Sequence, residues 1–281
     1  MIDGTSIRKG RFFLYKLIAI DMDGTLLNDQ FTISPENIAT LKKVKEYGAI
    51  IAICTGRPVN GVKQYEALLG GMIDYSISYN GGLIEDLANE NYINKSFLTY
   101  EDVIYLHEIS EQVQAPIQFY DENNLYTTSK YMNKYTVMDA YLGQTPLHYI
   151  DRADICKEAQ YPKVQFIDEP DRLTAIIKQL PATLYDRYTI MQSEPYFLEF
   201  VSKQTNKGLA LEKLAKKLNM KREEIIAFGN NENDIAMLDF AGCGVAMANA
   251  TNAVKNIADR ETLTNNDHGV AYMLEKTLQN K

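Results

Sequence analysis

The spacing of hydrophobic and polar positions over residues 17–79 predicts a βαβαβ unit. Short apolar runs rich in β-branched residues are typical of buried parallel strands, here expected at residues 17–20, 49–54 and 75–79. Two helices are expected between them, one running from the Ser34-Pro35 pair to Gly48 and one over 59–69. Crossovers of this kind are right-handed, so the three strand ends are expected to meet at one edge.

The pattern changes character between about residues 87 and 200, where it predicts an α+β insert. Strands are expected at 116–120, 124–127 and 163–167, and helices at 100–113 and 169–180. The αβ alternation then resumes with a helix over 206–218, strands at 225–228 and 243–247, and helices through Phe240, from Asn252 and from Gly269. We therefore expect a core formed by 15–86 and 201–281, an inserted domain over 87–200, and a leader of unknown role over 1–14.

Composition and charge narrow the class of partner. Hydrophobic residues make up 46% of the chain and charged residues 23%, which is ordinary for a globular protein. A formal net charge of −8 argues against nucleic acid or an anionic membrane surface as the main partner. Three scattered cysteines, Cys54, Cys156 and Cys243, indicate no disulfide framework and fit a reducing cytoplasm.

The first strand ends in Asp21-Met22-Asp23-Gly24, which is the strongest chemical signal in the chain. Side chains two residues apart on a strand point the same way, so Asp21 and Asp23 can address one site. Two carboxylates this close need a cation or a shared proton, an arrangement that suits a nucleophile, an acid/base and a metal. The alternative is an Asp-rich β-turn.

Further polar motifs follow the other strand ends. Thr55-Gly56-Arg57 and Asn80-Gly81 follow the second and third strands, and Gly229-Asn230 with Asn233-Asp234 follows a later one. Lys207 begins a helix, where the helix dipole disfavours a cation, so an anionic partner is indicated; the alternative is a solvated lysine. Neither a P-loop nor a Gly-x-Gly-x-x-Gly dinucleotide motif occurs.

Taken in order, these motifs resemble those of the haloacid dehalogenase (HAD) superfamily of phosphotransferases. The Asn206-Lys207-Gly208 step, the segment from Glu194 to Glu199 and the late Ala246-Met247-Ala248-Asn249-Ala250 run are similar to the Cof-type branch, in particular its YidA-like sugar phosphatases. The resemblance implies an α/β fold, with a Rossmann-like HAD core built on a parallel sheet and an inserted α+β cap of the Cof (C2) type.

The resemblance also implies roles for individual residues. Asp21 would be the nucleophile that carries the phosphoryl group as an aspartyl phosphate, and Asp23 the general acid and base. Phosphate binding is expected from Thr55, Gly56, Arg57, Lys207 and Asn233. Substrate contact is expected from Asn80 and Gly81, which in the alternative reading only make a turn. Mg²⁺ would be held by Asp21, the main-chain carbonyl of Asp23, Asn230 and Asp234.

Asn230 departs from the family pattern, which usually has Asp directly after this glycine. The amide can still offer a carbonyl oxygen, but the site loses one negative charge. We therefore expect weaker Mg²⁺ binding than is usual in the family, with Asp234 taking a larger part.

The sequence thus predicts a Mg²⁺-dependent phosphatase acting on small phosphorylated metabolites, in particular sugar phosphates, with the cap selecting the sugar. The alternative is a phosphosugar-binding or regulatory protein that lost turnover through Asn230. The pair of Asp21 and Asp23 favours the enzyme, because a binding protein needs no nucleophile and acid/base together. The particular phosphoester and the oligomeric state are not determined by the sequence.

Overall fold

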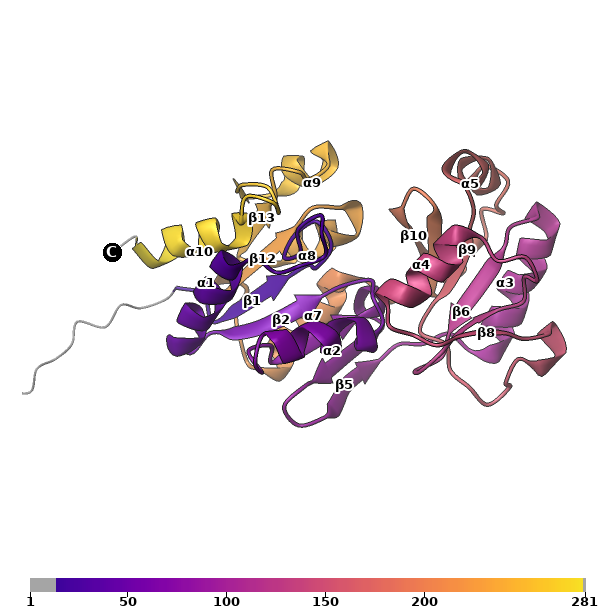
Figure 1. Ribbon diagram of the computed structural model, residues 1–281, viewed down its shortest axis with the longest axis horizontal. Helices are drawn as coiled ribbons and strands as arrows, with labels where there is room; N and C mark the ends of the chain where they lie inside the picture. Colours follow the sequence, from indigo (N-terminus) through magenta and orange to yellow (C-terminus); the bar gives the residue numbers. More distant parts are fainter. Residues whose placement is uncertain (1–13, 280–281) are drawn as a thin grey trace, which may run out of the picture.

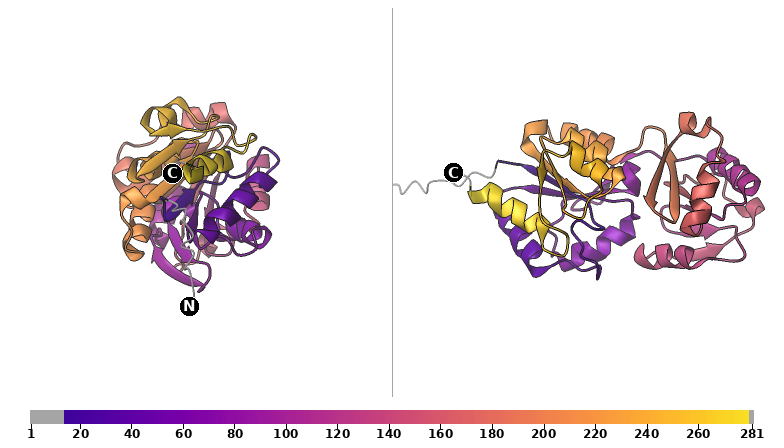
Figure 2. Two further views of the ribbon diagram at one scale, coloured as in Figure 1. Left: turned by 90° about the vertical axis from the view of Figure 1, so that its left-hand side faces the viewer. Right: turned by 90° about the horizontal axis from the view of Figure 1, so that it is seen from above.

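The computed structural model describes residues 14–279, which form two lobes, each built around its own sheet (Figure 1). Seen from above, the two lobes lie side by side along the long axis of the molecule (Figure 2). The expected leader, apart from Leu14, lies outside the described residues. Within residues 14–279 no helix is both long and apolar enough to cross a membrane. Cys54, Cys156 and Cys243 are all free thiols.

The core lobe contains an eight-stranded sheet in the order β14-β13-β12-β1-β2-β3-β4-β5. The pairs from β14 to β3 are parallel, and β4 and β5 are antiparallel additions at one edge. Its strands are β1 (Leu17–Ile20), β2 (Ile50–Cys54), β3 (Tyr75–Ser78), β4 (Leu83–Asp86), β5 (Asn91–Lys95), β12 (Ile225–Gly229), β13 (Cys243–Ala246) and β14 (Arg260–Glu261). The predicted βαβαβ unit and the strands predicted at 225–228 and 243–247 are therefore confirmed, whereas β4 and β14 were not predicted.

Helices pack around this sheet at the predicted positions. They are α1 (Pro35–Glu46), α2 (Val59–Leu68), α7 (Lys207–Lys217), α8 (Ile235–Phe240), α9 (Asn252–Ile257) and α10 (Gly269–Gln279), with short 3-10 turns η1 (Tyr79–Gly81), η3 (Arg222–Glu224) and η4 (Glu232–Asp234). Helix α1 begins as expected, because the Ser34 hydroxyl accepts a hydrogen bond from the Asn37 amide at 3.2 Å. Helix α1 packs beside α10, and α7 packs beside α8.

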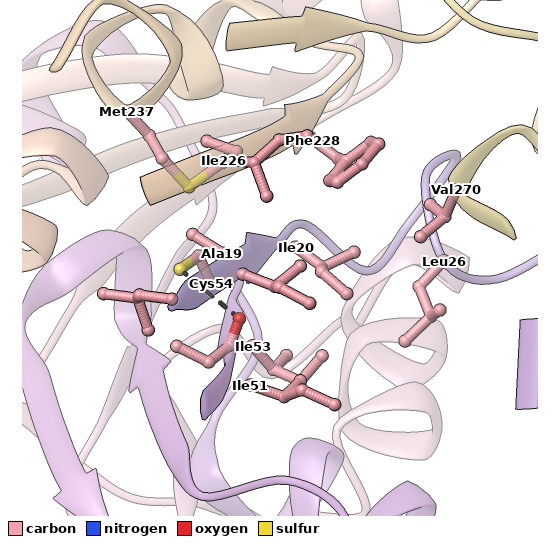
Figure 3. Packing of buried hydrophobic residues seen from close by; sticks show 14 of the residues in the cluster. Ala19, Ile20, Leu26, Ile51, Ile53, Cys54, Ile226, Phe228, Met237 and Val270 are labelled. Carbon is pink, nitrogen blue, oxygen red and sulfur yellow. Dashed lines mark hydrogen bonds between the residues drawn. The ribbon is translucent and has the colours of Figure 1, made fainter. Parts of the chain in front are cut away.

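Strand β1 lies in the middle of the sheet and is completely buried. Ile20, the last residue of the strand, lies between Ile53 of β2 and Phe228 of β12 (Figure 3). Burial of an aliphatic side chain stabilises a fold by roughly 1.5–3 kcal/mol, so this strand is firmly anchored. The residues that directly follow Ile20 are therefore held in a fixed position by the sheet.

The second lobe is an α+β unit with its own hydrophobic core, which includes Phe119, Phe166 and Phe200. Its six-stranded sheet has the order β10-β11-β9-β6-β7-β8, with β6 (Ile117–Tyr120), β7 (Leu125–Thr127), β8 (Leu147–Tyr149), β9 (Val164–Ile167), β10 (Tyr188–Glu194) and β11 (Phe197–Ser202). The helices are α3 (Tyr100–Val113), α4 (Lys134–Leu142), α5 (Pro170–Ile177) and α6 (Leu184–Arg187), with the 3-10 turn η2 (Arg152–Asp154). The pattern predicted β6, β7, β9, α3 and α5, but not β8, β10, β11, α4 or α6.

The pairing of β5 differs from the expected division of the chain at residue 87. Strand β5 forms a hairpin with β4 and so extends the core sheet. Its polar, half-exposed sequence suits an edge strand, and we therefore place the start of the insert after Lys95. The two chain crossings between the lobes are adjacent, since the Thr205 hydroxyl donates to the Ser96 hydroxyl at 3.0 Å.

Candidate active site

Asp21 and Asp23 follow β1 at the carboxyl edge of the core sheet, and both line one cavity. The Asp21 amide still donates to the Phe228 carbonyl at 3.0 Å, so the ladder with β12 continues as far as this residue. Gly24 then turns the chain with φ +70°, and a Cβ at this position would collide with the side chain of Asn230. The Asp-rich turn and the carboxylate site are thus the same structure.

A buried lysine lies beneath the first carboxylate. Lys207 Nζ is 2.7 Å from Asp21 Oδ1 and 2.6 Å from Asp234 Oδ1, and the lysine side chain is fully buried. The alternative of a solvated lysine is therefore wrong. Burial by itself lowers the pKa of Lys207, but the two carboxylates outweigh it and raise the pKa above its usual value.

One lysine does not neutralise two buried carboxylates. Burial, and after it the charge of Asp234, raises the pKa of Asp21 to about 7, and Lys207 opposes this rise only in part. The excess negative charge makes this point of the cavity favourable for a cation.

Asp234 uses both of its oxygens within the protein. Its Oδ1 accepts from Lys207, while Oδ2 accepts from the main-chain amides of Asn230 at 2.9 Å and Asn231 at 3.1 Å. These contacts hold the loop after β12 in place. They favour a positioning role, and direct metal ligation by Asp234 stays a prediction.

The side chain of Asn230 lies against the oxygens expected to bind Mg²⁺. With its amide nitrogen turned toward them, it donates to Asp21 Oδ2 at 3.1 Å and to the Asp23 carbonyl and the Thr25 hydroxyl, both at 3.0 Å. Neighbouring ligands of an octahedral Mg²⁺ at about 2.1 Å are about 3.0 Å apart. Turned the other way, the amide presents its oxygen at this spacing, so the residues present fit the ion. No group of three or more His, Cys, Asp or Glu side chains in the described chain forms a metal site, so main-chain and amide oxygens are needed.

The loop after β2 is tied to Asp23. Arg57 donates to both oxygens of Asp23, at 2.8 and 2.6 Å, and its Nη1 donates to the Leu142 carbonyl of the insert at 3.2 Å. Thr55 is buried, and its hydroxyl accepts from the Arg57 amide at 3.1 Å, which leaves the hydroxyl proton free to donate. Thr55, Gly56 and Arg57 line the cavity. Phosphate binding by Arg57 stays a prediction, while its contacts favour the orientation of Asp23.

Asn80 and Gly81 lie behind the cavity and do not line it. Asn80 is fully buried; its Nδ2 donates to Glu199 Oε2 at 2.5 Å, and its Oδ1 accepts from Asn233 Nδ2 at 2.9 Å. Gly81 has φ +102°, and a Cβ here would meet the main chain of Asn206. Their contacts favour the turn reading, whereas Asn233 does line the cavity.

The cavity, of about 430 Å³, is closed on the far side by residues of the insert that the sequence did not single out for a role. They include Asp139 from α4, Lys163 before β9, Glu194 from β10, and Tyr196 and Glu199 from the β10–β11 hairpin. The segment from Glu194 to Glu199 was a signal of the resemblance, but nothing in it indicated that it faces Asp23. Asp139 had no signal, because α4 itself was not predicted.

The fold and this geometry together define an α/β phosphatase with a cap. The model of the haloacid dehalogenase-like hydrolases matches residues 18–274, and the chain belongs to this family. Its resemblance to the family is therefore confirmed, as are the α/β core and the inserted cap.

Known relatives are similar to this protein over nearly the whole chain. YxeH of Bacillus subtilis is 39% identical over 94% of this chain and 98% of its own length. The 5-amino-6-(5-phospho-D-ribitylamino)uracil phosphatase YcsE of Bacillus subtilis is 32% identical over 91% of this chain and 93% of its own. The crystal structure of a haloacid dehalogenase-like hydrolase from Bacteroides thetaiotaomicron superposes with a TM-score of 0.83 at 33% identity, covering 93% of this chain and 99% of that one. The protein is thus a phosphoric monoester hydrolase that acts on phosphorylated substrates.

Proposed function

We propose that the protein is a Mg²⁺-dependent phosphatase of small phosphorylated metabolites, in particular sugar phosphates, and that it works through an aspartyl-phosphate intermediate. The observation that carries the proposal is the placement of Asp21. It follows the central strand, faces the cavity and has one oxygen fixed by Lys207 at 2.7 Å. A carboxylate held in this way is aimed at a bound phosphoryl group.

In the first step, an oxygen of Asp21 attacks phosphorus as the bond to the leaving alcohol oxygen breaks. Asp23, in its carboxylic acid form, donates its proton to that oxygen and becomes a carboxylate, and Arg57 holds the Asp23 carboxyl group in the required orientation. In the second step, Asp23 takes a proton from water as the water oxygen attacks phosphorus. Inorganic phosphate leaves, and the Asp21 carboxylate is restored.

The remaining residues stabilise charge at the phosphoryl group. The Thr55 hydroxyl can donate to a phosphoryl oxygen, and Lys207 offsets negative charge from below Asp21. Asp21 Oδ2, the Asp23 carbonyl and the Asn230 side-chain oxygen would hold Mg²⁺. When bound, the ion supplies positive charge that screens the phosphoryl oxygens from the carboxylates.

A second substrate candidate rests on the aromatic residues of the cavity. The relative YcsE is named for a phosphate ester that carries a substituted uracil ring. Phe31, Tyr196 and Phe197 line the cavity here, and Tyr196 stacks on Tyr135 at 4.1 Å between ring centroids. An aromatic base could therefore pack where a sugar ring would lie.

The test is hydrolysis of p-nitrophenyl phosphate with Mg²⁺ and with a chelator, in the parent chain and in Asp21→Asn. We expect turnover that requires Mg²⁺ and falls by at least about 10³-fold in the variant, because the nucleophile is lost. Asp239→Asn, at an exposed position of α8, is the matched control and should keep parental turnover. A parent chain without turnover that recovers in Asn230→Asp would mean a phosphatase fold that is idle at its metal site, and absence of turnover in both chains would support the phosphosugar-binding alternative.

A further inference from the structure

Residues of the insert line the part of the cavity that would receive the alcohol half of the substrate, and we call these residues the cap wall. Asp139, Lys163, Glu194 and Glu199 supply its charged side chains. These residues come from α4, from the segment before β9 and from the β10–β11 hairpin. Their pairing decides which charges remain available to a ligand.

Within residues 14–279, the two cationic side chains that line the cavity, Lys163 and Arg57, are already paired with carboxylates of the protein. Lys163 is almost fully buried, lies 3.0 Å from Glu199 Oε1, donates to the Gly56 carbonyl at 3.2 Å and stands over the Tyr120 ring. Arg57 is held by Asp23 and the Leu142 carbonyl. Among the described residues that line the cavity, no cationic side chain is left for a second anionic group of the substrate.

Two carboxylates of the cap wall, Glu194 and Asp139, have oxygen atoms without a hydrogen-bond partner among the described residues. The Glu194 side chain lines the cavity from the exposed end of β10 and makes no hydrogen bond or ion pair with a described residue. Asp139 Oδ2 accepts from Gln118 and from the Tyr120 hydroxyl, both at 2.6 Å, whereas its Oδ1 has no partner among the described residues. Glu199, in contrast, is saturated by Lys163, Gln165, Ser193 and Asn80.

We infer, on the basis of the proposed phosphatase function, that this wall selects monophosphate esters by charge. Esters whose alcohol part is neutral and hydroxyl-rich, or carries an ammonium group, are accepted, and esters with a second anionic group are rejected. Hydroxyl and ammonium groups donate to Asp139 and Glu194, whereas a carboxylate or second phosphate would face them with no free cation nearby. Asp139 and Glu194 are thus the residues that determine specificity.

The experiment compares substrates of one shape and different charge. The first set is glucose 1-phosphate, glucosamine 1-phosphate and glucuronic acid 1-phosphate; the second is ethyl phosphate, O-phosphoethanolamine and phosphoglycolate. kcat/KM is measured at saturating Mg²⁺ for each, and a set without turnover is compared as competitive inhibitors of p-nitrophenyl phosphate hydrolysis. We expect the anionic member to be at least tenfold poorer than the neutral one, and the cationic member to equal or exceed it.

Variants assign the effect to the wall. In Glu194→Gln and in Asp139→Asn the disadvantage of the anionic member should shrink at least threefold. Glu101→Gln, which removes one charge from the exposed face of α3, should leave it unchanged. Parental rates or inhibition constants that are equal across charges would overturn the inference alone, as would unchanged ratios in both wall variants. Absence of p-nitrophenyl phosphate turnover would overturn the proposed function itself, and the inference with it.

Discussion

Asn230 is the residue at which we expect this chain to depart from the family pattern, and its contacts are consistent with an amide at this position. An aspartate here would place a further carboxylate beside Asp21 and Asp234, which already share one lysine. The asparagine amide instead donates to Asp21 Oδ2 and to the Asp23 carbonyl. The neutral amide of Asn230 therefore stabilises the fold when no metal is bound, and it also leaves the site with one negative charge fewer for Mg²⁺ than an aspartate would.

For Asn230→Asp we expect tighter Mg²⁺ binding and a less stable fold in the absence of the metal. Two unit charges about 4 Å apart interact by roughly 4 kcal/mol at an effective dielectric of 20, before desolvation is subtracted. The Mg²⁺ concentration for half-maximal activity should fall about tenfold or more, and the melting temperature in chelator should drop below that of the parent. Saturating Mg²⁺ should raise the melting temperature of the variant more than that of the parent.

Gln160→Glu, at an exposed position of the cap outside its helices and strands, adds the same charge; it is the control and should match the parent in both measurements. Equal half-saturation in Asn230→Asp and the parent, or half-saturation of the parent in the low micromolar range, would contradict the expectation.

The sequence revealed the residues of the site that follow strands but not those of the cap. Asp21, Thr55 and Asn230 could be found because each directly follows a strand of one parallel sheet, where spacing along the chain fixes position in space. Asp139 and Glu194 come from another sheet and its helix, and their approach to Asp23 depends on how the lobes pack. Such long-range packing leaves no local pattern in the sequence.

At the scale of elements, the η1 turn fixes the start of helix α7. Gly81 adopts φ +102° with its α-carbon against the Asn206 main chain, and Asn206 caps α7 by accepting from the Leu209 amide at 2.8 Å. Lys207 is the next residue. The turn therefore sets the position of the lysine beneath Asp21, without touching the cavity.

We expect Gly81→Ala to lose both stability and activity. A positive φ costs a residue with a Cβ about 1–2 kcal/mol, and the clash with Asn206 adds to this. Gly48→Ala is the matched control, because Gly48 has φ +83° but open space around its Cβ position. Urea unfolding should show a loss of about 1 kcal/mol in the control and about 3 kcal/mol in Gly81→Ala, and only Gly81→Ala should slow p-nitrophenyl phosphate hydrolysis. Equal losses would mean that the contact with Asn206 is unimportant.

Elements were predictable where one face of a helix or strand carries the apolar residues. Helix α3 has the buried positions Val103, Leu106 and Ile109 at helical spacing, and it was predicted at its observed bounds. Helix α4 buries only Thr136 and Ala140 and exposes Val137 and Tyr141, so its sequence shows no apolar face to recognise. Strand β5 lies beyond the expected boundary at residue 87 but pairs with β4 in the core sheet, and hairpin pairing of this kind leaves no signal in composition.

For the whole molecule, acid stability depends on a buried histidine in the cap. His107 on α3 is 5% exposed, and its Nε2 lies 3.0 Å from the Thr128 hydroxyl. Burial lowers its pKa, and the attraction of Glu111 offsets this only in part. A lowered pKa means that the unfolded chain takes up a proton near pH 6.5 while the folded chain does not.

Stability is therefore expected to fall as the pH drops below about 6.5, with no contribution from His107 above it. The limit for one group is about 1.4 kcal/mol per pH unit. In His107→Gln, the difference in unfolding free energy between pH 7.5 and 5.5 should be smaller than in the parent, by no more than about 1.4 kcal/mol. Urea unfolding at the two pH values measures it, and His148→Gln, at an exposed position of β8, should keep the parental difference. A parental pH dependence in His107→Gln would contradict the assignment.

The hydrogen bond between Ser96 and Thr205 has a consequence for how such chains diversify. Where the chain leaves the core and where it returns lie side by side, so the whole cap is, for the core, a loop with adjacent ends. Because its ends are adjacent, each doubling of the length of such a loop costs the core only about 0.6 kcal/mol in closure entropy, and the strand before Asp21 and the helix that carries Lys207 lie outside it. The core, which carries the catalytic residues, and the cap, which we propose selects the substrate, can therefore change independently of each other in evolution.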